Sequence, residues 1–206
     1  MTDLQEILRL SATRHSHLCP RQVLGARIGL IGADILGFEL PRRNKKMLVI
    51  VETDGCFADG VEVATECTIG HRTLRIEDYG KVAATFINVE TEQAVRIAPL
   101  NDVRQLALQY APNERRHYFA QLQAYQTMPF EDLVTIQWVV LSNPVEKIVS
   151  RPGVRVNCQQ CGEEIINERE IVLNGVILCQ SCALGGYYQP APVYEPQHTV
   201  KQKISI

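Results

Sequence analysis

The sequence contains no uninterrupted apolar run of the length that a membrane-spanning helix needs. The apolar segment 23–36 is broken by Arg27 and Asp34, whereas a spanning helix requires about 20 predominantly apolar residues. The first residues also lack the basic start of a secretory signal, because Asp3 and Glu6 stand where positive charges would be. We therefore predict a cytoplasmic protein with no membrane association, in a compartment where cysteines stay reduced.

The chain also lacks an excess of either charge. Its 21 basic and 23 acidic residues leave a formal net charge of −2, and 46% of the residues are hydrophobic, as in an ordinary globular protein. From residue 151 onward, five basic residues are matched by five acidic ones. Nucleic-acid binding usually leaves a basic footprint, so a nucleic-acid-binding regulator is the least favoured function.

No internal repeat is present, and 206 residues suffice for one full core with a small appendage. The order of the predicted elements indicates an α+β fold, with a mixed or antiparallel sheet and helices packed on it. We expect three parts: a core domain over 1–145, a zinc ribbon over 154–188 and a proline-rich tail over 189–206.

Periodicity and turn residues place the individual elements. Helices are expected over 3–13, from Pro20 through the apolar stripe that ends at Ile35, and over 59–67, 101–110 and 113–126. Strands are expected over 47–53, 72–77, 82–89, 93–97 and 133–141, the second and third joined by a turn at 78–80.

The second predicted helix carries glycine at three positions on one face, Gly25, Gly29 and Gly32. Each costs a helix about 1 kcal/mol relative to alanine. We expect the compensation to be the close approach of another backbone, from a sheet or a partner subunit.

Four cysteines near the end of the chain form two Cys-x-x-Cys pairs separated by 17 residues: Cys158, Cys161, Cys179 and Cys182. This spacing predicts one tetrahedral structural zinc site. Between the pairs, Asn174-Gly175 stands between two short apolar runs and predicts a two-residue hairpin that returns the second pair to the first.

The other three cysteines, Cys19, Cys56 and Cys67, lie in the first third of the chain, and two histidines, His15 and His17, precede Cys19. Cys19 stands immediately before the expected helix start at Pro20, where free backbone N–H groups stabilise a thiolate. An isolated cysteine is otherwise most often a small buried hydrophobe, and this alternative applies above all to Cys56 and Cys67.

The order and spacing of four motifs resemble the FmdE family, named for the FmdE component of molybdenum formylmethanofuran dehydrogenase, some members of which carry a C-terminal zinc ribbon. The motifs are His15-x-His17-x-Cys19-Pro20, Glu52-Thr53-Asp54-Gly55-Cys56 with Asp59, Cys67-Thr68-Ile69-Gly70 with Leu74, and Asp78-Tyr79-Gly80-Lys81. The resemblance covers residues 11–141 and the ribbon.

The resemblance implies an α+β core, a homodimer and a metal-binding pocket. Carried onto this chain, the pocket residues are His15, His17, Cys19, Cys56 and Cys67, with Asp59 beside them. The chain departs from the family pattern at Ser16, Arg21 and Glu66, where glycine is usual, and at His71, where lysine is common.

Two functions follow from this resemblance. The first is a metal-dependent enzyme or redox-active factor, with a second zinc or iron in the core and with Cys19 and Asp59 as catalytic candidates. The second is a non-catalytic partner of a molybdenum or tungsten oxidoreductase, which would dock through the tyrosines of the tail: Tyr187, Tyr188 and Tyr194. Whether the protein is an enzyme stays open at this stage.

Overall fold

The structure, a computed structural model, describes residues 3–15, 17–40, 44–189 and 191, without the side chain of His15. The chain divides into two compact units, Met1–Val149 and Ser150–Ile206. Within the described residues, no helix is long and apolar enough to cross a membrane.

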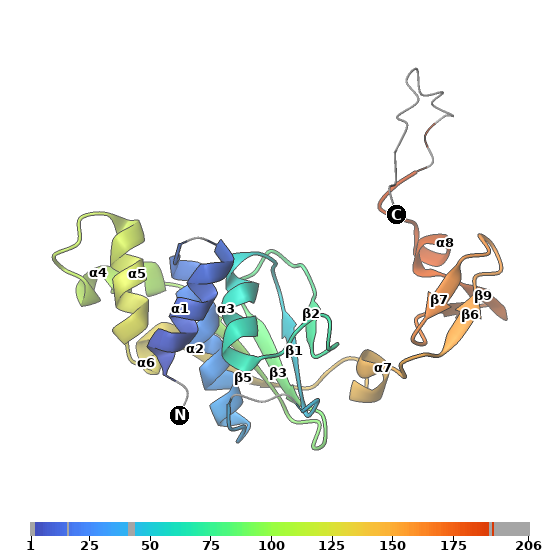
Figure 1. Ribbon diagram of the computed structural model, residues 1–206, viewed down its shortest axis with the longest axis horizontal. Helices are drawn as coiled ribbons and strands as arrows, with labels where there is room; N and C mark the ends of the chain where they lie inside the picture. Colours follow the sequence, from blue (N-terminus) through green and yellow to red (C-terminus); the bar gives the residue numbers. More distant parts are fainter. Residues whose placement is uncertain (1–2, 16, 41–43, 190, 192–206) are drawn as a thin grey trace, which may run out of the picture. The chain divides into compact units, whose positions relative to one another are not determined.

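The first unit combines helices with a single sheet (Figure 1). Its helices are α1 (Leu4–His15), α2 (Pro20–Ile35), α3 (Cys56–Thr65), α4 (Val103–Tyr110), α5 (His117–Thr127), α6 (Phe130–Leu133) and α7 (Val145–Val149). Its strands are β1 (Met47–Val51), β2 (Leu74–Ile76), β3 (Ala84–Asn88), β4 (Ala94–Pro99) and β5 (Val134–Val139).

The five strands lie in the order β2-β1-β3-β4-β5. β1 runs parallel to β2, and the other neighbouring pairs are antiparallel, so the sheet is mixed and the predicted α+β class is confirmed. The prediction that β2 and β3 form a hairpin is wrong. β1 lies between them, because the backbone after β2 folds back onto the end of β1, where Tyr79 and Lys81 donate to the carbonyl oxygen of Glu52.

α2 and α3 pack against each other through glycines, and α2 also lies on the sheet. A Cβ atom on Gly25 would lie 2.2 Å from the carbonyl oxygen of Phe57, and one on Gly60 would lie 2.2 Å from that of Gln22. The close approach expected for the glycine face is therefore present. Its main partner is a helix rather than the sheet or partner subunit that the sequence suggested.

The contacts between α2 and α3 also set their direction. Gly25 faces Phe57 near the start of both helices, and Gly29 faces Ala64 near the end of α3. The two helices therefore run parallel, and their N-termini lie at the same end of the layer.

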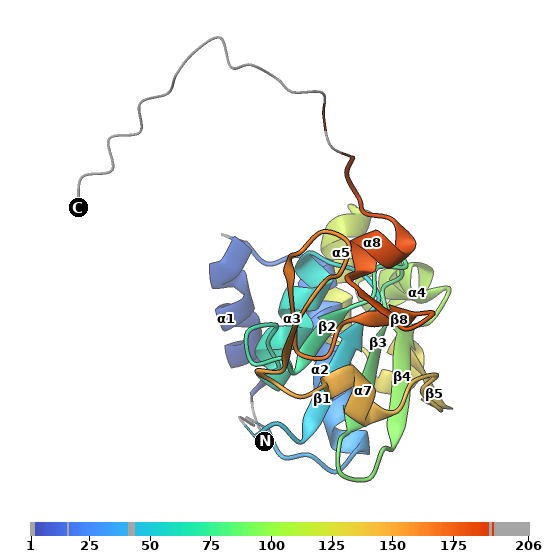
Figure 2. The same cartoon turned by 90° about the vertical axis from the view of Figure 1, so that its right-hand side faces the viewer.

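The sheet has apolar side chains on each face. Val49, Phe86 and Val95 stand in register across β1, β3 and β4 and belong to the main core beneath the helices. On the opposite face, Leu48 and Ile87 pack with Val145 of α7, which Figure 2 shows in front of the strands.

A charged pair on this opposite face fixes the end of β1. Glu52 is 8% exposed and accepts two hydrogen bonds from the Arg96 guanidinium, at 2.5 Å and 2.7 Å. This bidentate pair ties the residue after β1 to β4. The turn that leads from Glu52 to Cys56 consequently starts from a fixed point.

The second unit contains two small hairpins and one short helix. The elements are β6 (Arg155–Asn157), β7 (Glu164–Ile166), β8 (Ile171–Leu173), β9 (Val176–Leu178) and α8 (Gln180–Leu184). β6 pairs with β7, and β8 pairs with β9. Asn174 and Gly175 have φ values of 52° and 82°, the positive angles of the hairpin turn that this dipeptide favours.

Candidate functional site

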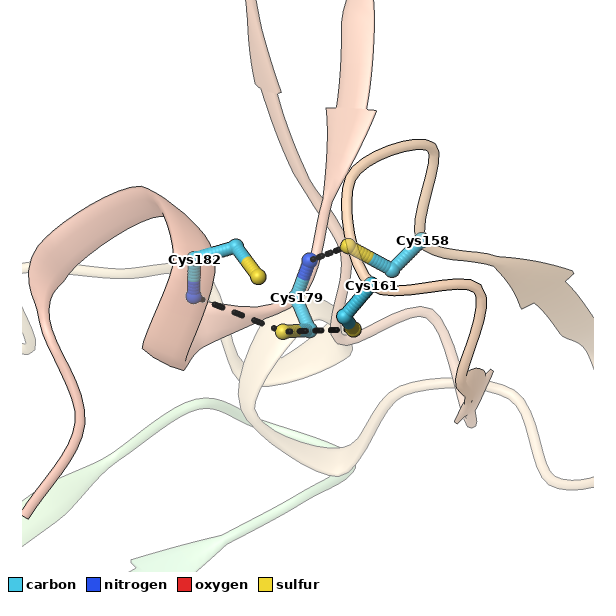
Figure 3. A group of neighbouring side chains, drawn as sticks. All are labelled: Cys158, Cys161, Cys179 and Cys182. Atoms are coloured by element: carbon cyan, nitrogen blue, oxygen red, sulfur yellow. Dashed lines mark hydrogen bonds between the residues drawn. The ribbon is translucent and has the colours of Figure 1, made fainter. Parts of the chain in front are cut away.

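The four cysteines of the second unit form one cluster (Figure 3). Their Sγ atoms all lie within 4.8 Å of one another, and those of Cys161 and Cys179 are 3.9 Å apart. Four thiolates around a zinc ion at about 2.3 Å in a tetrahedron would lie about 3.8 Å from each other. The donor set and the spacing therefore fit a closed four-sulfur metal site.

Backbone hydrogen bonds build this cluster from two separate turns. After β6, the chain turns through Gly162, at φ 80°, so that its N–H donates to the Cys158 carbonyl at 2.9 Å. Gln159 then joins the two hairpins: its N–H donates to the Ile177 carbonyl at 2.9 Å, and its Oε1 accepts from the Ile177 N–H at 2.8 Å.

The thiols of the cluster have opposite electrostatic surroundings. The backbone N–H groups of Cys161 and Cys179 lower the pKa of Cys158 to about 6. The neighbouring Cys179 sulfur, with burial and the other two thiols, raises the pKa of Cys182 to about 12. Four negative sulfurs repel one another unless a cation lies between them, and a divalent metal ion supplies that charge.

In the first unit, Cys19 and Cys56 come together although 36 residues separate them in the sequence. Cys19 is the N-cap of α2 and Cys56 is the first residue of α3, so the parallel packing of these helices places both sulfurs at one end. Burial and contact with the Cys19 side chain raise the pKa of the Cys56 thiol. We call Cys19 and Cys56 the thiol pair.

Gln22 fixes the backbone that carries Cys19. Its side chain is fully buried and accepts a hydrogen bond from the Cys19 N–H at 2.8 Å. Its amide nitrogen donates to the carbonyl oxygen of Ser11 in α1 at 2.9 Å. The N-terminus of α2 is therefore tied to α1 across the linker that contains both histidines.

Cys67, which the sequence grouped with these cysteines, lies elsewhere. It follows the end of α3, and a ten-residue helix is about 15 Å long. Its thiol is 4% exposed and approaches the Met47 carbonyl at 3.7 Å, and burial raises its pKa. Because α3 carries it away from Cys56, Cys67 is a core thiol, the alternative considered above.

Other groups lie near the thiol pair. Asp59, in the first turn of α3, acts electrostatically on Cys56; the predicted helix start at Asp59 is wrong, since α3 begins at Cys56. His17 is exposed, two residues before Cys19, and the side chain of His15 lies outside the described residues. Among the described side chains, three or more metal-binding groups gather only at the C-terminal cluster.

A third residue near the thiol pair was not indicated by any sequence motif. Tyr118, in α5, has its pKa raised by burial and by the charges of Cys19 and Cys56. Its side chain is 44% exposed. Only the packing of α5 against α2 brings it here, so periodicity within α5 would have been the sole clue.

Comparison with known proteins agrees with this arrangement. Residues 14–135, more than half of the chain, match the family described as "FmdE, Molybdenum formylmethanofuran dehydrogenase operon". This chain belongs to the FmdE family. The matched range contains Cys19, Cys56 and Tyr118, so the thiol pair lies within the family domain, and the four-cysteine cluster lies beyond it.

Two similar proteins extend beyond the family domain. The chain is 30% identical, over 90% of its length, to a "Probable S-adenosyl-L-methionine-binding protein" of Archaeoglobus fulgidus, of which it spans only 54%. Its fold is similar to that of an FmdE-like protein of tungsten formylmethanofuran dehydrogenase from Syntrophus aciditrophicus. That similarity has a TM-score of 0.54 and 21% identity and covers 91% of this chain and 96% of that one.

Proposed function

We propose that this FmdE-family protein is a cytoplasmic metal-binding protein with two distinct centres. In the second unit, Cys158, Cys161, Cys179 and Cys182 would hold a structural zinc. The sulfur spacing supports this assignment, as do the turns that hold it. Four protein sulfurs leave no position for water or substrate, so this centre would stabilise the unit rather than react.

The second proposed centre is the thiol pair, completed by an imidazole from His15 or His17. The observation that carries it is the meeting of Cys19 and Cys56 at the N-termini of two parallel helices. Helix N-termini favour anionic sulfur, which is the form that binds zinc or iron. Two sulfurs and one imidazole would leave a fourth position open, as in catalytic sites.

The residues around this centre suggest a division of roles. Bound metal would supply a Lewis acid that polarises a ligand in the open position. Asp59, one turn along α3 from Cys56, would accept or return a proton there. Tyr118, exposed beside both sulfurs, would limit what reaches them. Cys67 takes no part, because it lies at the other end of α3.

Metal content tests the core centre. We expect the purified protein to contain two metal ions per chain, and Cys19→Ser and Cys56→Ser each to contain one, because each removes a sulfur ligand. Elemental analysis by inductively coupled plasma mass spectrometry measures this, and Cys67→Ala is the matched control, with two ions. One ion in the unmodified protein, or two in a Cys19→Ser/Cys56→Ser double variant, would rule the core centre out.

A second candidate function is that of an assembly component, and strand β5 favours it. β5 pairs only with β4 among the described strands, so its outer edge has free backbone groups. Ile136 and Trp138 are 38% and 59% exposed on it, and Val140, just beyond its end, is 97% exposed. The occupant that fits is a second copy, because two β5 strands can pair antiparallel about a twofold axis.

We expect the protein to have twice the monomer mass in solution, and Trp138→Lys with Val140→Lys to convert it to a monomer, because two charges would be placed in the apolar interface. Light scattering coupled to size-exclusion chromatography measures the mass. Phe130→Lys, at an exposed residue outside β5, is the control and should stay dimeric. A monomeric unmodified protein, or a dimer that survives both substitutions, would refute pairing through β5.

The family's link to a formylmethanofuran dehydrogenase operon further suggests a molybdenum or tungsten oxidoreductase as a larger partner. Tyr187 is fully exposed and contacts Tyr188, with ring centroids 5.2 Å apart, an arrangement that suits a protein contact. Tyr194, the third tyrosine of the predicted docking surface, lies outside the described residues.

A further inference from the structure

A cavity of about 290 Å³ opens beside the first turn of α2, between the end of β4 and helices α4 and α5. Pro20 and Arg21 form one side of it, directly after Cys19 in the sequence. Gln121 and Tyr125 of α5 line it as well, three and seven residues after Tyr118. Since residues at these spacings share a helix face, the cavity and the thiol pair adjoin along α5.

The charge of this cavity has one sign. Two guanidinium groups line it, those of Arg21 and Arg104, and no aspartate or glutamate does. Within the described part of the chain, neither guanidinium is hydrogen-bonded to or paired with a carboxylate. This contrasts with Arg96 and Arg151, which are paired with Glu52 and Glu168.

The remaining lining separates into apolar and uncharged polar groups. Leu24, Val82 and the buried ring of Tyr125 form an apolar wall, and Asn101 and Gln121 contribute neutral amides. The positive end of the α2 dipole adds to the potential at the same side. A guanidinium fork binds carboxylate or phosphate oxygens in bidentate fashion, while an apolar wall excludes a fully hydrated inorganic ion.

We propose that this cavity is a binding site for a small organic anion, with a carboxylate or phosphate held by Arg21 and Arg104 and an apolar body against Leu24 and Tyr125. The volume limits the body to about the size of a single ring, since pockets for drug-sized ligands begin near 300 Å³. As the substrate subsite of the thiol pair, the cavity rests on the proposed function; as an anion site, it does not.

The test uses the full chain and four probes: benzoate, phenyl phosphate, neutral benzamide and inorganic phosphate. We expect saturable binding of the carboxylate or the phosphate ester, with benzamide and inorganic phosphate at least about tenfold weaker, because each lacks one of the two recognised features. Ligand-observed NMR titration measures the dissociation constants, and the stronger of the first two distinguishes carboxylate from phosphate recognition.

Variants locate the binding. Arg21→Ala and Arg104→Ala should each weaken it by at least about tenfold, and Arg21→Lys should retain part of it. Arg115→Ala, in the exposed connection between α4 and α5, is the matched control and should bind as the unmodified protein does. Unchanged melting temperatures show that each variant is folded.

Three results would overturn the proposal: no saturable binding of either organic anion, equal affinity for benzamide, or binding that survives the double variant Arg21→Ala/Arg104→Ala. Metal analysis of the same samples separates the two proposals. Anion binding with one ion per chain refutes the core metal centre alone, whereas two ions without anion binding refute the cavity alone.

Discussion

Removal of metal from the four-cysteine cluster is expected to unfold the second unit and to leave the first unit folded. Among the described residues after 149, only Cys158 and Ile165 are buried apolar side chains. Two buried side chains cannot offset the conformational entropy of about 40 ordered residues. Metal binding in such modules contributes on the order of 10 kcal/mol, and this contribution would be lost entirely.

Two-dimensional ¹H–¹⁵N NMR of the full chain can follow this loss. After chelation, we expect amide signals from 154–184 to collapse to unfolded positions while those of the sheet in the first unit persist, and zinc addition to restore them. Cys161→Ser should reproduce the loss, and Gln160→Ser, at the exposed neighbouring position, should not. Dispersed signals from metal-free protein would show that the unit folds without an ion.

Gly25→Ala is expected to be the most destabilising single substitution in the first unit. In an open helix, this change stabilises by about 1 kcal/mol. Here the new Cβ would lie 2.2 Å from the Phe57 carbonyl oxygen and 3.0 Å from the Val61 nitrogen, and both belong to the backbone of α3, which cannot rotate away. The helices would have to separate, at a cost of about 3 kcal/mol or more.

Urea denaturation monitored by the single tryptophan, Trp138 in β5, measures this cost. Gly70→Ala is the matched control, because a Cβ there meets nothing within 4 Å, and its free energy of unfolding should change by less than about 0.5 kcal/mol. Separation of α2 from α3 would also part Cys19 from Cys56, so core metal should fall with stability. A Gly25→Ala protein as stable as the unmodified one would contradict the close packing.

Several features could be predicted from the sequence because their causes are local. Pro20 begins α2, since proline suits a first helical position, and Asn174-Gly175 forms its hairpin because both residues tolerate positive φ. The spacing of the C-terminal cysteines likewise indicated their cluster. The sequence also indicated the α+β class, from the order of its periodic segments.

Other features depend on contacts between distant segments. The sequence could not show that β2 joins β1 in parallel, since that pairing depends on how the chain returns after Ile76. It placed Cys67 with Cys56 because eleven positions separate them, whereas the length of α3 moves them apart. Tyr118 and the cavity beside Arg21 and Arg104 appear only when α5 packs on α2.

What the sequence by itself determined are the ligand types, the turns and the helix starts, because each depends on the chemistry of a few adjacent residues. What the tertiary structure decided is which of these groups meet. Glycine faces let α2 and α3 approach in parallel, and that approach, rather than any spacing along the chain, brings Cys19 to Cys56 and excludes Cys67.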